Sequence, residues 1–400
     1  MTNKRICVIG LGYIGLPTAS LLATKGYDVL GVDVSSNVVD TINSGKVHIV
    51  EPDLDILVKS AVHSGNLKAA LEPEQADIFI IAVPTPFKDG YQPDLSYVEQ
   101  ATQKISPFVK PDNLVILEST SPTGTTLNTV ARILKENGHD IDQDVHVAHC
   151  PERVLPGRIL QELVENDRIV GGINKASTKI AANFYHEFVK GEVLETDSKT
   201  AEMAKLTENA FRDTNIAFAN EISVICDEHQ IDPWELISLA NRHPRVNILQ
   251  PGPGVGGHCI AVDPWFIIAG SPEASRLIRT ARQVNDDKTD WVINKVVEKA
   301  SRFKNPRIAC LGLAFKADVD DLRESPALKI VKHIQEKNIG EVVACEPNIK
   351  EHESIPLVSL ENAISTADIV LLLVDHKPFK ALNSVDLKEK IIIDTRGVIR

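Results

Sequence analysis

The sequence predicts an α/β protein in which two doubly wound, Rossmann-like domains are joined by a long central helix and its helical domain. Strand-like apolar runs alternate with helical patterns at both ends of the chain, which is typical of parallel sheets covered by helices. Residues 307–314 also resemble residues 5–12, so the C-terminal part looks like a second version of the first. We place the domains at residues 1–195, 196–300 and 301–400.

The first sheet begins with a dinucleotide-binding pattern. A buried strand at residues 5–9 leads into a turn containing Gly10, Gly12 and Gly15, followed by a helix and a second strand that ends before Asp33. In this pattern the glycines permit a tight turn, close approach of a pyrophosphate, and close packing of the helix on the strand. The acid would accept hydrogen bonds from a ribose and repel a 2′-phosphate, which favours NAD over NADP. The alternative is a glycine-rich turn without a ligand.

Composition limits the other functions. The chain has 400 residues and a net charge of −12, with no long basic run. This argues against nucleic acid and anionic membranes as main partners. The sequence shows neither a bilayer-spanning apolar run nor a signal peptide, so we expect a cytoplasmic protein. Six scattered cysteines without a CxxC pair predict no metal site and no disulfide framework. Cys7, Cys310 and Cys345 lie in strand patterns and are expected to be inert core residues.

Polar segments follow the next strands of the first sheet. The strands are predicted at residues 78–83, 114–117 and 145–148, and each is followed by hydroxyl or charged residues. Ligands bind at the carboxyl ends of such strands. The segments of interest contain Thr85, residues 118–126, and residues 150–158, where Glu152 can orient a water and Arg153 and Arg158 can pair with phosphate. Turns and helix N-caps are the alternative interpretation.

The predicted helix over residues 199–229 carries a polar face. Lys205, Asn209 and Arg212 follow at spacings of four and three residues and therefore share one side of the helix. The lysine charge and the asparagine N–H can stabilise a developing oxyanion. A solvated polar stripe is the alternative. A long amphipathic helix between two sheets is also a common dimerisation surface.

Cys259 lies in a segment, residues 244–264, that is too rich in proline and glycine for regular structure. A cysteine thiolate can hold an aldehyde covalently while a second hydride leaves. Beside a dinucleotide site, Cys259 therefore predicts an alcohol oxidised twice, to a carboxylate, with Asp263 as a base or water ligand. The alternatives are a structural thiol in a single-step dehydrogenase of the β-hydroxyacid type, which needs no second α/β domain, and an NAD-dependent sensor without turnover.

The C-terminal domain has Ala314 where the first sheet has Gly12, so we expect no second pyrophosphate turn there but the binding of another nucleotide. Lys316 and Arg323 follow its first strand and either face this ligand or form ordinary surface.

Taken in order, these segments resemble the UDP-glucose/GDP-mannose dehydrogenase family over essentially the whole chain. The sequences CPERVLPG (residues 150–157) and GGHCIAVDP (residues 256–264) look most like those of its UDP-N-acetyl-D-mannosamine dehydrogenases. They depart from the pattern typical of UDP-glucose dehydrogenases. The UDP-N-acetylglucosamine dehydrogenases are close relatives, and the C2 configuration of the sugar is left open.

The resemblance implies oxidation of a sugar C6 hydroxyl with two NAD⁺ and one water, and a homodimer built on the central helices. The product would supply synthesis of a surface polysaccharide. The implied catalytic residues are Cys259, Lys205, Asn209, Asp263, Thr120 and Glu152. Besides the turn glycines, the implied NAD contacts are Tyr13, Ile14, Asp33, Thr85, Thr125 or Thr126, and Arg323. The implied substrate contacts are Arg153, Val154, Lys205, Asn209, Arg212, His243, Arg245, Gly256, Phe315, Lys316 and Arg396. No metal is implied.

Overall fold

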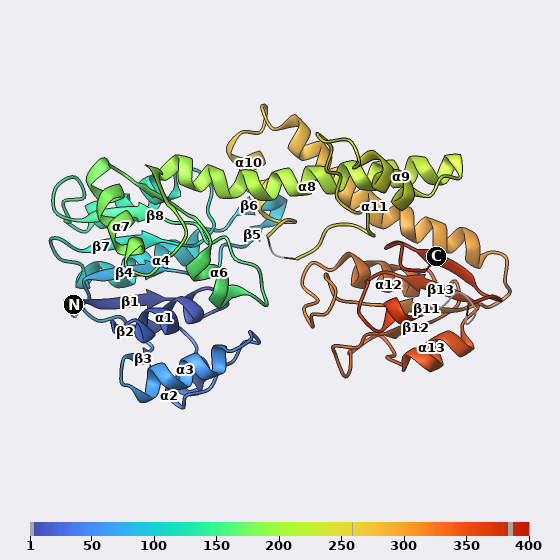
Figure 1. The fold of residues 1–400 in the computed structure, drawn as a ribbon, viewed down its shortest axis with the longest axis horizontal. Coiled ribbons are helices and arrows are strands. Elements are labelled where there is room, and N and C mark those ends of the chain that lie inside the picture. The colour runs from blue at the N-terminus through green and yellow to red at the C-terminus, as the bar shows by residue number, and fades with distance from the viewer. Residues whose placement is uncertain (1–3, 258, 383–386, 400) are drawn as a thin grey trace. The chain divides into compact units, whose positions relative to one another are not determined.

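The computed structural model describes residues 4–257, 259–382 and 387–399. The chain divides into two compact units, Met1–Thr207 and Glu208–Arg400, shown in Figure 1.

The first unit is built on an eight-stranded sheet in the order β10-β9-β8-β7-β4-β1-β2-β3. Its strands are β1 (Arg5–Ile9), β2 (Asp28–Val32), β3 (Leu67–Ala70), β4 (Ile78–Ile81), β7 (Leu114–Leu117), β8 (His146–His149), β9 (Arg168–Gly172) and β10 (Val193–Asp197). Neighbouring strands are parallel except β8 and β9, which pair antiparallel. A small hairpin is formed by β5 (Phe87–Lys88) and β6 (Gln92–Pro93).

Helices cover both faces of this sheet, and each face has its own core. Successive residues of β1 alternate between the two cores: Ile6 and Val8 enter one, and Cys7 and Ile9 enter the other. The first core is covered by α1 (Gly15–Thr24), α2 (Ser36–Asn43), α3 (Leu54–His63), α6 (Ile159–Glu165) and α7 (Lys175–His186). The second is covered by α4 (Ser96–Ile105), the π-helical turn η3 (Thr126–Ala131) and α5 (Arg132–Glu136). Short 3₁₀ turns occupy Asp89–Tyr91 and Ser106–Phe108.

The second unit combines long helices with a smaller sheet. Helix α8 (Ser198–His229) starts in the first unit and continues into the second, where α9 (Pro233–Ala240), α10 (Asp263–Gly270) and α11 (Arg276–Ala300) follow. The four-stranded parallel sheet has the order β12-β11-β13-β14. Its elements are β11 (Arg307–Leu311), α12 (Pro326–Glu336), β12 (Glu341–Cys345), α13 (Leu360–Thr366), β13 (Ile369–Leu372), the 3₁₀ turn Phe379–Ala381 and β14 (Ile391–Asp394).

The predicted fold class is confirmed, with differences in detail. The long helix begins one residue earlier than predicted, at Ser198. The irregular segment ends at Val262 because Asp263 opens α10, with proline at its second position, where no backbone N–H is needed. Cys7, Cys310 and Cys345 are buried strand residues, as predicted, and burial raises the pKa of each thiol. Among the described residues, no helix has the length and apolarity needed to cross a membrane.

Candidate functional site

The glycine turn after β1 has the geometry of a dinucleotide cradle. Gly10 has a φ of +91°, and a side chain there would collide with the carbonyl of Ala82. A Cβ at Gly15 would lie 1.8 Å from the Gly10 oxygen, so helix and turn pack without space for a side chain. A Cβ at Gly12 would meet nothing within 4 Å, which leaves open space on the side where a pyrophosphate would approach. The turn therefore fits the cofactor that its sequence predicts.

Helix α1 begins beside this turn without a capping side chain and without an acidic residue in its first turn. Its N-terminus therefore keeps the positive end of its dipole for an anion. Tyr13 is exposed and Ile14 half-buried at this end. Asp33, directly after β2, accepts hydrogen bonds from the Leu11 N–H (3.0 Å) and the Ser35 N–H (3.0 Å), which fix the carboxylate at the edge of the turn.

The ends of β4 and β7 bring two predicted residues together. The Thr85 hydroxyl donates to the Thr120 carbonyl at 2.6 Å, and both side chains are half-buried. The Thr120 segment is further tied to β4, because the Ser119 hydroxyl donates to the Val83 carbonyl at 2.7 Å. The loops carrying one predicted NAD contact and one predicted catalytic residue are therefore fixed to each other.

Thr125 and Thr126 are buried, and their hydroxyls have protein partners. The Thr125 hydroxyl donates to the Pro122 carbonyl at 2.7 Å. Thr126 donates from its N–H (2.7 Å) and hydroxyl (2.6 Å) to one carboxylate oxygen of Glu202, and the other oxygen accepts the Gly124 N–H. Burial raises the pKa of Glu202, although these three donors lower it. Glu202, near the start of α8, thus fixes the turn that leads into η3.

Glu152 is buried after the end of β8. One of its oxygens accepts the Arg153 N–H at 2.7 Å and the other accepts a hydrogen bond from Arg168 at 2.8 Å. Arg153 and Val154 are half-buried. The Arg153 guanidinium donates to the Asp167 carbonyl at 2.9 Å. Arg158 is exposed and lies beside Glu162.

Helix α8 carries Lys205, Asn209 and Arg212 as predicted. Lys205 is half-buried and Arg212 exposed. Asn209 is buried, and its amide donates to the Asp263 carboxylate at 2.5 Å. Two of the predicted catalytic residues, 54 positions apart in the sequence, are therefore in direct contact.

Cys259 is exposed and lies four residues before Asp263, the first residue of α10. Its carbonyl accepts hydrogen bonds from the N–H groups of Val262 (3.0 Å) and Asp263 (2.8 Å), so the cysteine is joined to the first turn of that helix. The Asp263 carboxylate is held by Asn209 at the same point. The cysteine, the acid and the asparagine thus form one connected group within the second unit.

The glycines before the cysteine allow close packing against the segment after β11. Gly257 has a φ of +82°, and a Cβ there would lie 2.8 Å from the Phe315 ring. A Cβ at Gly256 would lie 2.5 Å from the Glu324 carbonyl oxygen. The Gly257 N–H donates to the Arg323 carbonyl at 3.3 Å. The predicted substrate residues Gly256 and Phe315 therefore lie next to each other.

The other predicted ligand residues of this unit lie in polar surroundings. Lys316 is exposed. The Arg323 guanidinium makes a two-point contact with the Asp321 carboxylate, at 3.0 and 2.6 Å. Two guanidinium nitrogens of Arg396 contact a single oxygen of Asp375, Oδ1, at 3.0 and 2.9 Å. His243 and Arg245 are exposed after α9, where the Arg245 N–H donates to the His243 ring at 3.3 Å.

Consecutive parts of the chain match the domains of one family. Residues 4–189 match the NAD-binding domain, residues 199–287 the central domain and residues 309–400 the UDP-binding domain of the UDP-glucose/GDP-mannose dehydrogenases. The chain belongs to the UDP-glucose/GDP-mannose dehydrogenase family. Membership makes it an NAD-dependent nucleotide-sugar dehydrogenase, and the prediction of NAD as the cofactor is confirmed.

Its relatives in this family match along nearly their full length. The chain is 56% identical to an NDP-N-acetyl-D-galactosaminuronic acid dehydrogenase of Ralstonia nicotianae, over 99% of this chain and 96% of the relative. It is 54% identical to a UDP-N-acetyl-D-mannosamine dehydrogenase of Campylobacter jejuni, over 95% and 97%. The solved UDP-D-ManNAc dehydrogenase of Pyrococcus horikoshii has a TM-score of 0.92 at 42% identity, covering 99% of this chain and 96% of that one.

Sequence reasoning gave no role to Glu202 or Arg168, although both are buried and contact predicted site residues. The available signal was weak: Glu202 is one of several acids in a helical pattern, and Arg168 opens an apolar strand.

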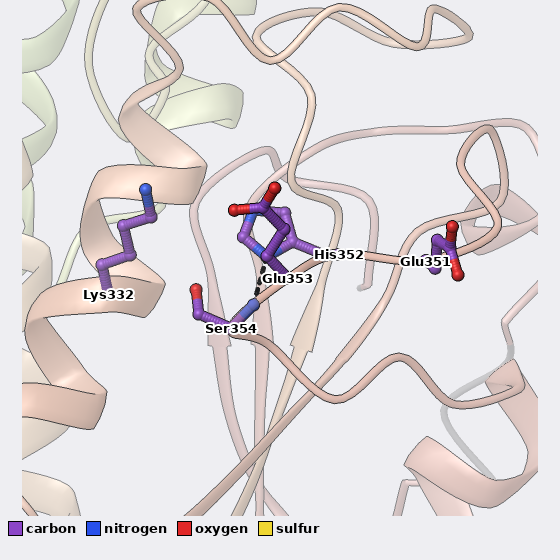
Figure 2. A pocket seen from close by; sticks show the side chains of 5 residues that line it. All are labelled: Lys332, Glu351, His352, Glu353 and Ser354. Atoms are coloured by element: carbon purple, nitrogen blue, oxygen red, sulfur yellow. Dashed lines mark hydrogen bonds between the residues drawn. The ribbon is translucent and has the colours of Figure 1, made fainter.

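A cavity of the second unit lies elsewhere, between α12 and the segment after β12 (Figure 2). It is lined by Lys332, Glu351, His352, Glu353 and Ser354, none of which was predicted to act. Within the described ranges, no group of three or more His, Cys, Asp or Glu residues is arranged to hold a metal ion.

Proposed function

We propose that this dehydrogenase oxidises the C6 hydroxyl of a UDP-N-acetylhexosamine to a carboxylate, with UDP-N-acetylmannosamine as the substrate. The observation that carries the proposal is the connected group of Cys259, Asp263 and Asn209, with an Asn209–Asp263 hydrogen bond of 2.5 Å. A single-step alcohol dehydrogenase requires no exposed cysteine held beside a buried acid. The 54% identity to the Campylobacter jejuni relative supports the choice of sugar.

The proposed reaction transfers four electrons. NAD⁺ held at the glycine turn would supply the oxidant for the two hydride losses. In the first oxidation the C6 hydroxyl also gives up its proton to a base. After the first, the Cys259 thiolate adds to the C6 aldehyde, and the oxygen of the resulting thiohemiacetal is stabilised by the Lys205 charge and the Asn209 amide. Loss of the second hydride leaves a thioester on Cys259.

Water then attacks the thioester carbonyl. A C–O bond forms, the C–S bond breaks, the thiolate leaves with the electron pair, and the water proton passes to a base. We assign Asp263, Glu152 and Thr120 to orienting or activating this water, following their positions in the family pattern. The UDP moiety would contact residues of the C-terminal sheet, including Phe315, Lys316 and Arg396. The uronate product would enter surface-polysaccharide synthesis.

A sugar of galacto configuration is the second candidate. It is favoured by the 56% identity to the Ralstonia nicotianae relative, whose name specifies N-acetylgalactosaminuronic acid. UDP-N-acetylglucosamine and UDP-glucose are the remaining candidate substrates, because the residues of the site do not encode the C2 or C4 configuration of the sugar.

The test counts NADH formed per sugar consumed, with UDP-ManNAc, UDP-GalNAc, UDP-GlcNAc and UDP-glucose offered separately. We expect two NADH per sugar and the highest kcat/KM with UDP-ManNAc. Two NADH per sugar with a preference for another sugar would support the double oxidation but assign a different substrate. One NADH per sugar would refute the double oxidation and make Cys259 a structural residue.

A matched pair of variants tests the cysteine. Cys259→Ser should bind NAD normally but stall before carboxylate release, because a serine hydroxyl is a much weaker nucleophile than a thiolate. Cys226→Ser is the control, since Cys226 is a buried residue of α8 with a raised pKa. Full two-step turnover by Cys259→Ser would exclude the covalent route.

We also propose a homodimer that uses α8. Phe211, Phe218 and Ile225 follow at intervals of seven residues and are 67%, 50% and 42% exposed. Residues seven apart lie on the same side of a helix, so these side chains form one apolar stripe. Exposed apolar stripes of this kind are typical of interfaces. The described residues of this unit leave the stripe exposed to this extent, and a second copy would bury it.

A further inference from the structure

Four side chains form a buried polar cluster at one edge of the first unit's sheet. Glu118 follows β7, Glu152 follows β8, Arg168 opens β9, and Tyr185 lies on α7. All four are nearly inaccessible to solvent. Only Glu152 has a role in the proposed function.

The sheet topology explains how an arginine reaches this edge. Strands β7 and β8 are parallel, so their carboxyl ends meet at the same side of the sheet. Strand β9 pairs antiparallel with β8, so its first residue, rather than its last, lies at that side. The antiparallel pairing of β8 and β9 therefore places Arg168 at the edge of the sheet where Glu118 and Glu152 follow their strands.

The hydrogen bonds connect the cluster. Arg168 donates to Glu152 Oε2 at 2.8 Å and to the Leu163 carbonyl at 3.2 Å, and its guanidinium lies over the Tyr185 ring, 5.6 Å from the centroid. The Tyr185 hydroxyl donates to Glu118 Oε1 at 2.7 Å. Glu118 Oε2 is buried without a hydrogen-bond partner among the described residues.

The charges in the cluster do not balance when both acids are ionised. Two buried carboxylates then share one guanidinium, and a buried charge without compensation is unfavourable. Burial raises the pKa of Glu118, Arg168 lowers it, Glu152 raises it and the Tyr185 hydrogen bond lowers it, and the net result is a pKa of about 7. The groups facing Glu118 are Arg168 from β9, Tyr185 from α7, and Cys150 and Glu152 from the segment after β8. Burial raises the pKa of the Cys150 thiol to about 12, so Cys150 stays neutral.

We propose that Arg168, Tyr185 and Glu118 are positioning residues that fix the Glu152 carboxylate and control how far Arg168 compensates its charge during hydrolysis of the thioester. This inference rests on the proposed function, in which Glu152 helps to activate the water.

The coupling has a defined direction. When Glu118 is protonated, the Arg168 guanidinium compensates the Glu152 carboxylate alone. When Glu118 loses its proton, the same guanidinium faces two negative charges and attracts the Glu152 carboxylate less strongly. A carboxylate that is held less strongly by a cation is a better partner for the proton of the attacking water. Hydrolysis should therefore accelerate as Glu118 ionises.

The test follows decay of the acyl-enzyme on Cys259 after a single turnover, by rapid quenching and intact-protein mass spectrometry. Glu118→Gln retains an oxygen for the Tyr185 hydrogen bond but stays neutral. We expect acyl-enzyme decay about three- to tenfold slower than wild type at pH 8, where Glu118 is ionised in the wild type, and a rate within about twofold at pH 6. Both NADH-forming steps should keep wild-type rates.

Tyr185→Phe provides a second variant with a different signature. It removes a hydrogen bond that lowers the pKa of Glu118, so the acceleration should remain but move to higher pH. Glu187→Gln is the matched control, because Glu187 is also a glutamate of the first unit that accepts a hydrogen bond from a tyrosine hydroxyl. Its partner is Tyr27, the residue before β2. It should leave the pH dependence of decay unchanged.

Three results would overturn the inference. Wild-type decay of Glu118→Gln at both pH values would show that Glu118 is not coupled to hydrolysis. Equal slowing of the NADH-forming steps would show that the cluster only supports the fold. A wild-type protein that forms one NADH and no acyl-enzyme would refute the proposed function itself, and this inference with it. The last result is distinguishable because it appears without any substitution.

Discussion

Replacing Asp213 with alanine should destabilise the second unit strongly. Asp213 is fully buried on α8 and pairs with Arg282 of α11, which is 3% exposed, at 2.7 Å. Asp213 also accepts a hydrogen bond of 2.8 Å from the Asn285 amide. The neighbouring helices α8 and α11 (Figure 1) are thus joined through this carboxylate.

The magnitude follows from what the substitution leaves behind. Asp213→Ala removes a buried charge partner. Among the described residues, Asp286 is then the acid that still pairs with the Arg282 guanidinium, and its side chain is 43% exposed. Breaking a buried ion pair on one side costs about 3–5 kcal/mol. For a unit of this size, each kcal/mol lowers Tm by about 2–4 °C, so we expect a fall of roughly 6–20 °C.

The assay is differential scanning calorimetry, with the transition of the second unit followed separately from that of the first. Glu298→Ala is the control, because it removes surface contacts of Glu298 with Arg302 and Lys299. The Glu298 and Arg302 side chains are 62% and 61% exposed, so the substitution should change stability by about 0.5 kcal/mol or less. A loss below about 1 kcal/mol for Asp213→Ala would refute the reasoning, because it would mean that water reaches Arg282 at little cost.

Three further predictions concern the cofactor, pH and assembly. Asp33→Ala should weaken NAD binding about tenfold or more in calorimetric titration, since hydrogen bonds to a charged group contribute about 1.5–3 kcal/mol, and unchanged affinity would exclude the ribose role. The pKa of Glu118 is 4.5 in the unfolded chain and about 7 in the folded protein. Its contribution to the free energy of unfolding is therefore complete below pH 4.5 and is lost as pH rises through 7. Relative to Glu118→Gln, wild type should lose about 3 kcal/mol of unfolding free energy over that interval, and parallel pH profiles of urea denaturation would contradict it. Phe218→Lys should give monomers in sedimentation velocity, whereas a dimer that persists would place the interface elsewhere.

Local patterns were sufficient to predict much of the fold. The strand at residues 28–32 and the helix at 199–229 were recognised because each has a continuous apolar or helical pattern bounded by glycine, proline or a charged residue. The glycine turn was equally clear, since Gly10 and Gly15 meet steric limits that only a residue without a side chain satisfies, and Gly12 leaves open space for a ligand.

Contacts between distant segments were harder to predict. The contact of Arg168 with Glu152 depends on the direction of β9, and the apolar run that follows Arg168 does not reveal whether that strand is parallel or antiparallel. Similarly, the spacing on α8 placed Asn209 on a polar face but did not show that Asp263 would accept its amide hydrogen bond. Such pairings follow from tertiary packing, which one sequence specifies only through many weak preferences acting together.

One signal in the sequence does explain how the cysteine segment is held. Asparagine is a poor residue for a helix interior, because its amide competes for backbone hydrogen bonds. Yet α8 contains Asn215 and Asn220, and both contact the irregular segment. Asn215 donates to the Asn247 carbonyl at 2.9 Å and accepts the Leu249 N–H at 3.0 Å. Asn220 accepts the Gly252 N–H at 2.8 Å.

A segment rich in proline and glycine cannot satisfy its own backbone groups through a ladder or a helix, so other groups must do so. The two asparagines supply both donors and acceptors, which a carboxylate or a lysine could not. Their unfavourable helix propensity is therefore offset by the order they impose on the segment before Cys259. Polar residues inside the long helix thus have a structural reason that is separate from the chemistry proposed for Lys205 and Asn209.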